Sequence, residues 1–219
     1  MPHDVITPNL LIEAYSSGLF PMAEGREDKE LFWVDPEERG VIPLDDFHIP
    51  KSLAKHIRQN HFKITLDTVF QDVVKSCSRP ARGRETTWIS ERIETLYTGL
   101  FKRGFAHSVE VWEEDELVGG LYGVSLSGAF FGESMFSTKT NASKTALVYL
   151  VAQLKAGGYF LLDTQFITDH LKQFGAREIS REEYKMRLDY ALRQKRTEFG
   201  QFSIAASGAD VLQFITQTS

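Results

Sequence analysis

Two polar groupings inside apolar stretches are the best candidates for chemistry in this chain. The first is Glu133, within residues 130–137, and the second is the pair Asp163 and Gln165, at the end of the apolar residues 159–162. A carboxylate in apolar surroundings carries a desolvation cost, and an active site is one common reason why that cost is tolerated. These side chains therefore indicate chemistry more than packing.

The spacing of Asp163 and Gln165 predicts how they cooperate. In an extended chain, side chains two residues apart face the same side, so we expect both to project together into an apolar cavity. Asp163 would then fix the orientation of the Gln165 carboxamide, and a fixed amide can position an amine or a developing oxyanion. The structural alternative is that Asp163 only caps the next helix.

Glu133 also has two interpretations. In a strand, Phe131, Glu133 and Met135 share one face, so the carboxylate points where two apolar side chains point. It could face a ligand, holding an amine or orienting a donor, or it could belong to a structural ion pair. Trp88 and Met22 lie near predicted loops or element ends, where they could contact a stacked base; the alternative for both is a place in the core.

Composition is that of an ordinary globular protein. The chain has 219 residues, of which 42% are hydrophobic and 25% charged, as in one medium domain with or without a small appendage. The net charge of -5 argues against a protein that coats nucleic acid. Lys51, Lys55 and Arg58 nevertheless stand in an acid-free stretch, residues 49–65, which is either a solvated face or a patch for a polyanion such as an RNA stem.

Several classes of protein are disfavoured. Cys77 is the only cysteine, so no internal disulfide forms; it is either a nucleophile or, more commonly, a small buried residue. With no apolar leader and no run near the roughly 18 residues of a membrane span, we expect a cytoplasmic protein without membrane contact. The histidines lack the spacing of a zinc site, and we find no phosphate-binding glycine loop or hydrolase nucleophile motif.

The predicted elements form a mixed α/β pattern. Helices are expected at 8–17, 50–59, 69–77, 90–103, 141–156, 168–174 and 181–194, and strands at 31–34, 62–67, 107–112, 117–124, 129–136 and 159–163. Residues 19–22 read as an apolar loop, Asn141 as a helix N-cap, and the tail as weakly patterned. Gly119, Gly120 and Gly123 suggest a bulge or a close approach to the backbone.

The order of these elements predicts the architecture. A helix, an antiparallel meander, a helix, a buried strand and a helix give an α/β chain with a mixed (α+β) sheet covered by helices, the order typical of the acetyltransferase-like (GNAT) superfold. Residues 1–40 are expected to form a small N-terminal subdomain packed on a catalytic domain at 41–219, because the first piece is too small for a core of its own.

Longer motifs make a family resemblance specific. They are residues 15–21, 33–36, 87–89, 106–112, 117–123, 132–137, 141–147 and 163–165. In these the chain resembles the leucyl/phenylalanyl-tRNA–protein transferase family, from about residue 8 to about residue 190. Met22 departs from the family pattern, which often has Trp there, and the tail after about residue 195 matches poorly.

The resemblance implies an activity. An enzyme of this kind moves Leu or Phe from an aminoacyl-tRNA to the N-terminal Arg or Lys of an acceptor protein, which forms a peptide bond and marks the protein for N-degron degradation. It implies a GNAT-like acyltransferase domain behind a small N-terminal domain, and neither a metal nor a coenzyme.

The resemblance also implies residue roles. Asp163 and Gln165 match the pair to which catalysis is attributed, and Glu133 matches a site glutamate. The pocket for the aminoacyl side chain and the terminal adenosine would be lined by Met22, Trp88, Leu121, Phe130, Leu147 and Leu150. The tRNA acceptor stem would be faced by Lys51, Lys55 and Arg58.

Two functions of other classes stay open at this point. A non-catalytic RNA-binding module would use the basic stretch and the aromatic residues, but it leaves Asp163 and Gln165 unexplained. A small-molecule N-acetyltransferase is disfavoured because residues 135–141, which enter a helix, contain no glycine to hold a pyrophosphate. For the transferase, the attacking amine's proton could pass through Gln165 or through a tRNA ribose hydroxyl.

Overall fold

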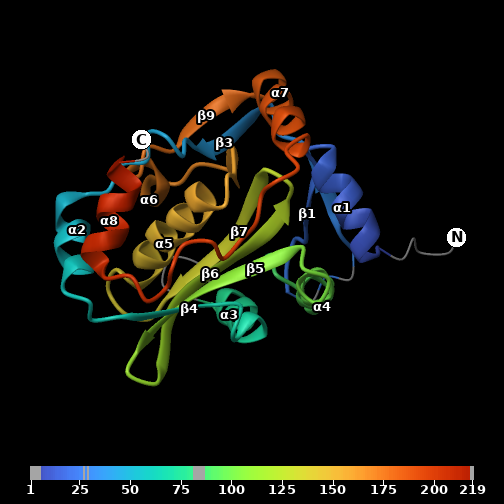
Figure 1. Cartoon of the computed structure of the whole chain (residues 1–219). Coiled ribbons are helices and arrows are strands. Elements are labelled where there is room, and N and C mark those ends of the chain that lie inside the picture. Colours follow the sequence, from blue (N-terminus) through green and yellow to red (C-terminus); the bar gives the residue numbers. More distant parts are fainter. Residues whose placement is uncertain (1–5, 27, 29, 81–86, 218–219) are drawn as a thin grey trace, which may run out of the picture.

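A seven-stranded mixed sheet forms the centre of the molecule. The computed structural model describes residues 6–26, 28, 30–80 and 87–217. Along the sheet the strands run β4 (Lys63–Leu66), β5 (Ala106–Glu113), β6 (Glu116–Leu126), β7 (Ala129–Ser137), β8 (Leu161–Gln165), β3 (Glu38–Ile42) and β9 (Arg177–Ser180). Figure 1 shows this sheet passing through the molecule with helices on both sides.

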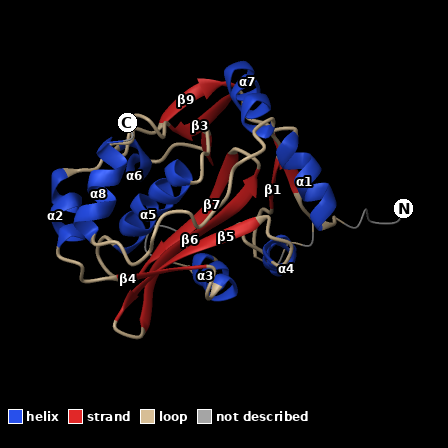
Figure 2. Ribbon diagram, in the orientation of Figure 1, coloured by secondary structure: helices blue, strands red, loops and turns tan. Residues whose placement is uncertain are grey.

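A two-stranded sheet and eight helices complete the described part of the chain. The small antiparallel sheet pairs β1 (Phe20–Met22) with β2 (Phe32–Val34). The helices are α1 (Pro8–Ser16), α2 (Lys51–Arg58), α3 (Phe70–Cys77), α4 (Glu91–Phe101), α5 (Ala142–Ala156), α6 (Asp169–Lys172), α7 (Arg181–Leu192) and α8 (Gly208–Gln217). Figure 2 shows the two kinds of element by colour.

Strands β7 and β8 form the parallel pair, and they pair over a short distance. Residues Ala129, Phe130 and Phe131 lie opposite Leu161, Leu162 and Asp163. Beyond that point β7 continues to Ser137 and β8 ends at Gln165, without further pairing between them. The two strands therefore separate just where the polar residues of the sequence motifs stand.

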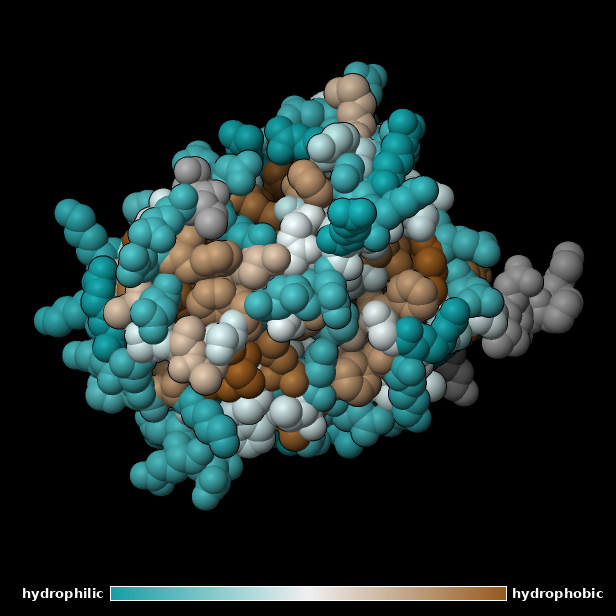
Figure 3. All heavy atoms as spheres, in the orientation of Figure 1, coloured by the Kyte–Doolittle hydropathy of each residue, from teal (hydrophilic) through white to brown (hydrophobic). Residues whose placement is uncertain are grey.

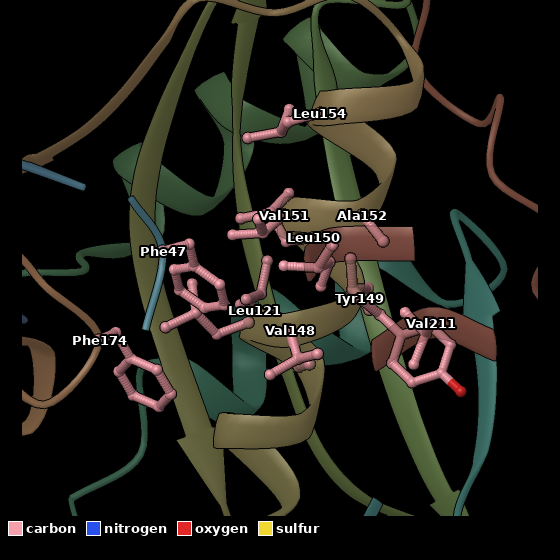
Figure 4. Close-up of a cluster of buried hydrophobic side chains, with 14 of the residues drawn as sticks. Phe47, Leu121, Val148, Tyr149, Leu150, Val151, Ala152, Leu154, Phe174 and Val211 are labelled. Carbon is pink, nitrogen blue, oxygen red and sulfur yellow. The ribbon is translucent and has the colours of Figure 1, made fainter. Parts of the chain in front are cut away.

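Helix α5 covers one face of the sheet, together with α2 and α8. It contacts β5, β6 and β7, and α2 and α8 pack on it. Its residues from Ala142 to Leu154 are buried on nearly all sides, except Lys144, as expected for a helix enclosed between a sheet and other helices. Figure 4 shows its side chains gathered with Leu121 of the sheet and Val211 of α8.

The opposite face carries α3 and α4, with α1 packed on α4. Helix α3 contacts β5, β6 and β7, and α4 contacts β5 and α3. The rings of Phe70 in α3 and Phe101 in α4 stack with their centroids 4.4 Å apart. Tyr15 of α1 and Tyr97 of α4 are fully buried in the same core cluster, so the N-terminal helix belongs to this layer.

The main pattern of elements agrees with the sequence prediction, and four elements were not anticipated. Strand β1 stands where an apolar loop was expected, and β3, β9 and α8 were missed. The sequence of β3 begins Glu38-Arg39-Gly40, which does not read as a strand, yet it pairs with β8 on one side and β9 on the other. Tertiary pairing therefore outweighs its weak local preference.

Asn141 is not the side-chain cap that the sequence predicted. It adopts a left-handed conformation with φ 67° and its side chain makes no capping hydrogen bond. Instead, the Ser137 hydroxyl accepts a hydrogen bond from the backbone N–H of Ser143, at 3.3 Å. The first helix does have a side-chain cap, because the Thr7 hydroxyl accepts a hydrogen bond from the backbone N–H of Leu10 at 3.3 Å.

A bulge in β7 changes the expected facing of its side chains. Ser134 lies opposite Tyr122 and Gly132 opposite Gly123, so Glu133 is an extra residue without a partner on β6. The bulge shifts the alternation by one residue. Phe131 packs in the cluster beneath α3 and α4, whereas Met135 packs against the cluster beneath α5. The prediction that Phe131 and Met135 share a face is wrong for this reason.

The expected close approach at the glycines of β6 is confirmed. A Cβ atom at Gly123 would lie 2.3 Å from the Phe131 carbonyl oxygen, and one at Gly119 would lie 2.5 Å from the Cβ of Ala142. The absence of a side chain at Gly123 therefore lets β6 and the bulged β7 pair closely.

Other features bear on the sequence predictions. Cys77 is fully buried. Strand β3 spans residue 40, where the boundary between the two predicted domains was placed.

In the part of the chain that the structure describes, no helix is both long and apolar enough to cross a membrane. On the face shown in Figure 3, hydrophobic residues gather over the middle of the molecule within a hydrophilic surround.

Helix α8 supports α5, so truncating its buried side chains should destabilise the protein. Ile215 is buried and belongs to the core cluster around α5. We expect Ile215→Ala to lower the free energy of unfolding by about 2–4 kcal/mol, because it leaves a cavity. Ile204→Ala makes the same change at an exposed position and should cost less than about 1 kcal/mol. Urea unfolding of both variants tests this; equal losses would show that α8 does not stabilise the core.

Candidate active site

A cavity of about 770 Å³ opens where β7 and β8 separate. This is the size of a typical small-molecule site. Its walls come from β1, β6, β7, α5, β8 and α6 and are largely apolar. Of the sequence-predicted site residues, those that line it are Met22, Trp88, Leu121, Glu133, Leu147, Leu150 and Gln165. Figure 4 shows Leu121 and Leu150 close to each other between the sheet and α5.

Phe130 lies away from the cavity lining. It is fully buried, and its ring stacks on Phe199 at 5.9 Å and meets Tyr159 edge-on at 6.4 Å. The structure thus gives Phe130 a place in the core behind the pocket, which differs from the pocket position implied by the resemblance.

Lys51, Lys55 and Arg58 also lie outside the cavity. They occupy positions i, i+4 and i+7 of α2, and all three side chains are exposed. Positions with this spacing share one face of a helix, so the three cations form a single basic surface. We refer to it below as the α2 basic face.

Asp163 is held in a buried ion pair with Arg39. The Arg39 Nη2 lies 2.7 Å from Asp163 Oδ2, and Nε lies 3.0 Å from Oδ1. Both side chains are almost completely inaccessible. Burial acts to lower the pKa of Arg39, but the carboxylate of Asp163 outweighs it and raises that pKa overall. The guanidinium therefore stays charged beside the carboxylate.

Further contacts complete the surroundings of this ion pair. The Tyr184 hydroxyl donates to Asp163 Oδ2 at 2.7 Å, and Arg39 Nη1 donates to the Gly18 carbonyl at 2.8 Å. The guanidinium also lies over the rings of Phe20 and Tyr184, 4.6 and 4.3 Å from their centroids. With its charge paired and its oxygens hydrogen-bonded, Asp163 is not available as a proton acceptor for a ligand.

Asp163 fixes the main chain of Gln165, not its carboxamide. Asp163 Oδ1 accepts a 2.8 Å hydrogen bond from the backbone N–H of Gln165. Gln165 adopts a left-handed conformation with φ 58°, which is unusual for a side chain of this type. The two side chains therefore do not project together as the extended spacing predicted. Gln165 lines the cavity, whereas Asp163 lies behind it.

Nor does Asp163 cap the helix that follows. The N-cap of α6 is Thr168, whose side chain accepts a hydrogen bond from Leu171. The alternative that Asp163 is only a helix cap is therefore wrong.

The carboxamide of Gln165 has unused hydrogen-bonding capacity. Within the described residues, its nitrogen is buried without a hydrogen-bond partner, and so are the Thr164 hydroxyl and the His170 Nε2. Buried polar atoms are rarely left without partners. All three belong to residues that line the cavity, so a small rotation of the Gln165 side chain would let its carboxamide nitrogen bond to a molecule there.

Glu133 forms the opposite polar wall. The hydroxyls of Tyr15 and Tyr97 donate to its two carboxylate oxygens, each at 2.7 Å. Burial raises its pKa to about 7, although both tyrosine hydrogen bonds act to lower it. Within the described residues, Glu133 forms no salt bridge, which removes the structural ion pair from its two interpretations. It faces the cavity.

Four residues of the site were not found from the sequence. Arg39 and Tyr184 surround Asp163, and Tyr15 and Tyr97 surround Glu133. The three tyrosines stand at helical positions that read as core. The sequence could have indicated that Arg39 is buried, because it directly precedes the mostly apolar residues 40–44. It could not have indicated the partner, because Asp163 lies 124 residues away.

Comparison with known proteins decides the family. A family model described as leucyl/phenylalanyl-tRNA protein transferase matches residues 41–189, and the model of the N-terminal domain of the same transferase matches residues 4–37. The chain belongs to the leucyl/phenylalanyl-tRNA–protein transferase family. The resemblance drawn from the sequence motifs is thereby confirmed, and with it the prediction that the chain is an aminoacyltransferase.

Relatives match over nearly the full length. A leucyl/phenylalanyl-tRNA–protein transferase of Caulobacter vibrioides is 56% identical over 216 residues, covering 99% of both chains. The corresponding protein of Nitrobacter winogradskyi is 53% identical over 98% of this chain and 96% of its own. That of Paramagnetospirillum magneticum is 57% identical over 85% of this chain and 90% of its own.

The buried ion pair predicts a large loss of stability when one partner is removed. In Arg39→Met, the Asp163 carboxylate loses its counter-charge, so we expect unfolding to become easier by about 3–5 kcal/mol. Arg187→Met is the matched control, because Arg187 pairs with Glu183 one helical turn away at the surface, and it should cost at most about 1 kcal/mol. Thermal and urea unfolding measure both; similar losses would contradict the importance assigned to the pair.

Proposed function

We propose that this chain transfers a leucyl or phenylalanyl group from its tRNA to the N-terminal Arg or Lys of an acceptor protein. The observation that carries the proposal is the cavity, which has largely apolar walls and in which Gln165, whose carboxamide nitrogen has no partner among the described residues, and Glu133 are both lining residues. Peptide-bond formation from an activated ester needs this combination of a pocket, an oxyanion donor and an amine site.

The apolar part of the cavity suits a leucyl or phenylalanyl side chain. Leu121, Leu147 and Leu150 line it together with Leu162. Trp88 and Met22 lie on the cavity wall as well, and we assign them to the terminal adenosine of the tRNA. Apolar walls select for large aliphatic or aromatic groups, but one methylene alters selectivity by only about 1–3 kcal/mol.

Gln165 stabilises the ester carbonyl in this proposal. Its carboxamide nitrogen can donate to the carbonyl oxygen, and the hydrogen bond strengthens as negative charge develops on that oxygen. Asp163 is a positioning residue, because it holds the backbone of Gln165 without reaching the cavity. Its pairing with Arg39 makes that position rigid.

Glu133 receives the acceptor's α-amine. A carboxylate attracts an ammonium group, and the two can share a proton over a hydrogen bond. The amine nitrogen then attacks the ester carbonyl carbon, the bond from that carbon to the ribose oxygen breaks, and the ribose oxygen leaves with a proton as a hydroxyl.

The fold, the α2 basic face and family membership each add to the proposed function. The mixed sheet with its meander, helix and parallel strand supports a GNAT-like catalytic domain at 41–219, with residues 1–40 as a small N-terminal domain. The α2 basic face would contact the acceptor stem of the tRNA. By family membership the chain would act in the cytoplasm without a metal or coenzyme, and its products would enter N-degron degradation.

A transfer assay tests the activity. Purified protein is mixed with tRNA charged with labelled leucine and with a peptide beginning with Arg. Label should appear in a peptide one residue longer, and an N-acetylated version of the same peptide should remain unlabelled. Retention of the tRNA without transfer would favour an RNA-binding module, and extension by acetyl-coenzyme A would favour an N-acetyltransferase; either result overturns the proposal.

Substitution of Gln165 should affect the chemical step. We expect Gln165→Ala to reduce kcat by about 100-fold or more, the usual loss for an oxyanion donor, with little change in the affinity for charged tRNA. Gln173→Ala is the control, because it also removes a carboxamide. Gln173 is the C-cap residue of α6 and does not line the cavity. Single-turnover kinetics separate binding from transfer, and a near-normal rate in Gln165→Ala would remove this residue from the chemistry.

The α2 basic face should set the salt dependence of tRNA binding. Each phosphate contact contributes to the slope of log K against log salt, so Lys51→Ala with Lys55→Ala should reduce that slope by about 2 if both contact phosphates. Lys102→Ala, an exposed lysine at the end of α4, should leave it unchanged. Filter binding of charged tRNA at several salt concentrations gives the slopes; an unchanged slope in the double variant would place the tRNA elsewhere.

A further inference from the structure

Three polar groups from three distant parts of the chain meet beside the cavity. Tyr15 of α1 and Tyr97 of α4 each donate to one oxygen of Glu133 in β7, and their own hydroxyls contact each other. Both tyrosines are fully buried, and Glu133 faces the cavity. The three groups therefore form a closed triangle of oxygen contacts, which we call the Glu133 triangle.

The number of protons determines when this triangle is complete. Each tyrosine hydroxyl carries one proton, and a carboxylate carries none. With Glu133 ionised, two protons serve three oxygen contacts, so the contact between the two hydroxyls has no proton. With Glu133 protonated, the acid donates to Tyr97, Tyr97 donates to Tyr15 and Tyr15 donates to the carbonyl oxygen of the acid. Each contact then has one donor and one acceptor. In the ionised form both hydroxyls instead donate to the carboxylate, and these charge-assisted bonds are the stronger ones, so on balance the tyrosines lower the pKa of Glu133.

We infer that the Glu133 triangle is the proton acceptor for the α-amine of the acceptor protein, with Tyr15 and Tyr97 as positioning residues. This inference rests on the transferase activity proposed above and deepens it. The bulge at Glu133 supports it, because the extra residue turns the carboxylate between the two hydroxyls on one side and the cavity on the other.

The proton balance is complete without another reactant. The acceptor arrives as an ammonium group, and one N–H proton passes to the Glu133 carboxylate, which leaves a neutral amine. The amine lone pair forms the new bond to the ester carbonyl carbon, and the ribose oxygen leaves with the bonding electrons. A second N–H proton then goes to the ribose oxygen, and Glu133 returns its proton to water when the product departs.

The proton affinity of Glu133 fits this task. Its pKa of about 7, raised chiefly by burial, lies close to that of an α-amino group at about 7.7–8.0. Matched affinities make proton transfer nearly balanced in energy. The other charged groups near Glu133 are Asp163, which raises its pKa, and Arg39, which lowers it. The two tyrosines are themselves kept protonated, because burial and then Glu133 raise their pKa values.

The remaining titratable residues of the cavity wall are Arg79, Glu116, Tyr122 and His170. The pKa of His170 is lowered, first by burial and then by Lys144. Tyr122 packs edge-on against Tyr97. None of the four shifts the pKa of Glu133 directly, so the acid limb of the pH profile should report the triangle.

The test is the pH dependence of transfer in three variants. In the wild-type protein, the rate should fall as the pH drops below about 7, because Glu133 must be ionised to accept a proton. Tyr15→Phe and Tyr97→Phe each remove one hydrogen bond to the ionised carboxylate, so the acid limb should move up by about one pH unit, or about tenfold in rate at the acid side. Glu133→Gln should transfer slowly and lose that limb.

A matched control is available in Tyr159→Phe. Tyr159 is also buried, and its hydroxyl bonds to Ser125 outside the cavity lining, so its loss should leave the acid limb in place. A merely structural role for Tyr15 and Tyr97 would lower the rate equally at all pH values. That result, or an unchanged acid limb in Glu133→Gln, would overturn the inference.

A second measurement does not require transfer. Infrared spectroscopy follows the C=O band of a protonated carboxyl group during a pH titration. A band that titrates near pH 7, disappears in Glu133→Gln and shifts in Tyr15→Phe supports the triangle. If these shifts occur but the wild-type protein transfers no leucine, the proposed function fails and the proton site stands. If transfer is normal but no such band exists, the triangle fails alone.

Discussion

The buried pairing of Arg39 with Asp163 is the interaction on which the rest of the site depends. Two charges removed from water are stable only with each other and with further hydrogen bonds, and here those bonds come from Tyr184, Gln165 and the Gly18 carbonyl. The pair thus connects β3, β8, α7 and the turn that follows α1. Because Asp163 also accepts the backbone N–H of Gln165, the pair fixes a residue that lines the cavity.

The cavity exists because the parallel pairing of β7 and β8 stops after three residue pairs. Each strand then departs from regular geometry in its own way: β7 by the bulge at Glu133, and β8 by the left-handed conformation of Gln165. The two carboxylates near this point differ because of what surrounds them. Asp163 faces a guanidinium and is fully occupied, whereas Glu133 faces two hydroxyls and has a raised pKa. Asp163 therefore holds the wall of the cavity in place, whereas Glu133 is the carboxylate to which we assign the exchange of a proton.

The sequence predicted the cavity-facing residues better than their supports. Glu133 and Gln165 stood out because polar groups within apolar strands are conspicuous, and the long helices and the meander followed from periodicity. Tyr15, Tyr97 and Tyr184 fit apolar helical positions equally well as plain core residues, so only the folded chain shows what their hydroxyls contact. The sequence placed Met135 on the wrong face of the sheet. One extra residue in a strand moves every later side chain to the other face, and the alternation of residue types does not reveal where such a bulge occurs.

The N-terminal segment contacts the residues of the candidate site directly, although the sequence presents it as an appendage. Its helix α1 supplies Tyr15 to Glu133, and the turn after that helix supplies the Gly18 carbonyl to Arg39. The Arg39 contact is buried and the Glu133 contact is partly buried, so separating this segment would leave an unpaired donor or acceptor at each, which costs free energy. The two family models meet between residues 37 and 41. The parts of the chain on either side of that boundary nevertheless stabilise each other through these contacts. If the acceptor amine binds Glu133 as proposed, its binding is coupled to the packing of α1 through the same carboxylate, and a change in one alters the other.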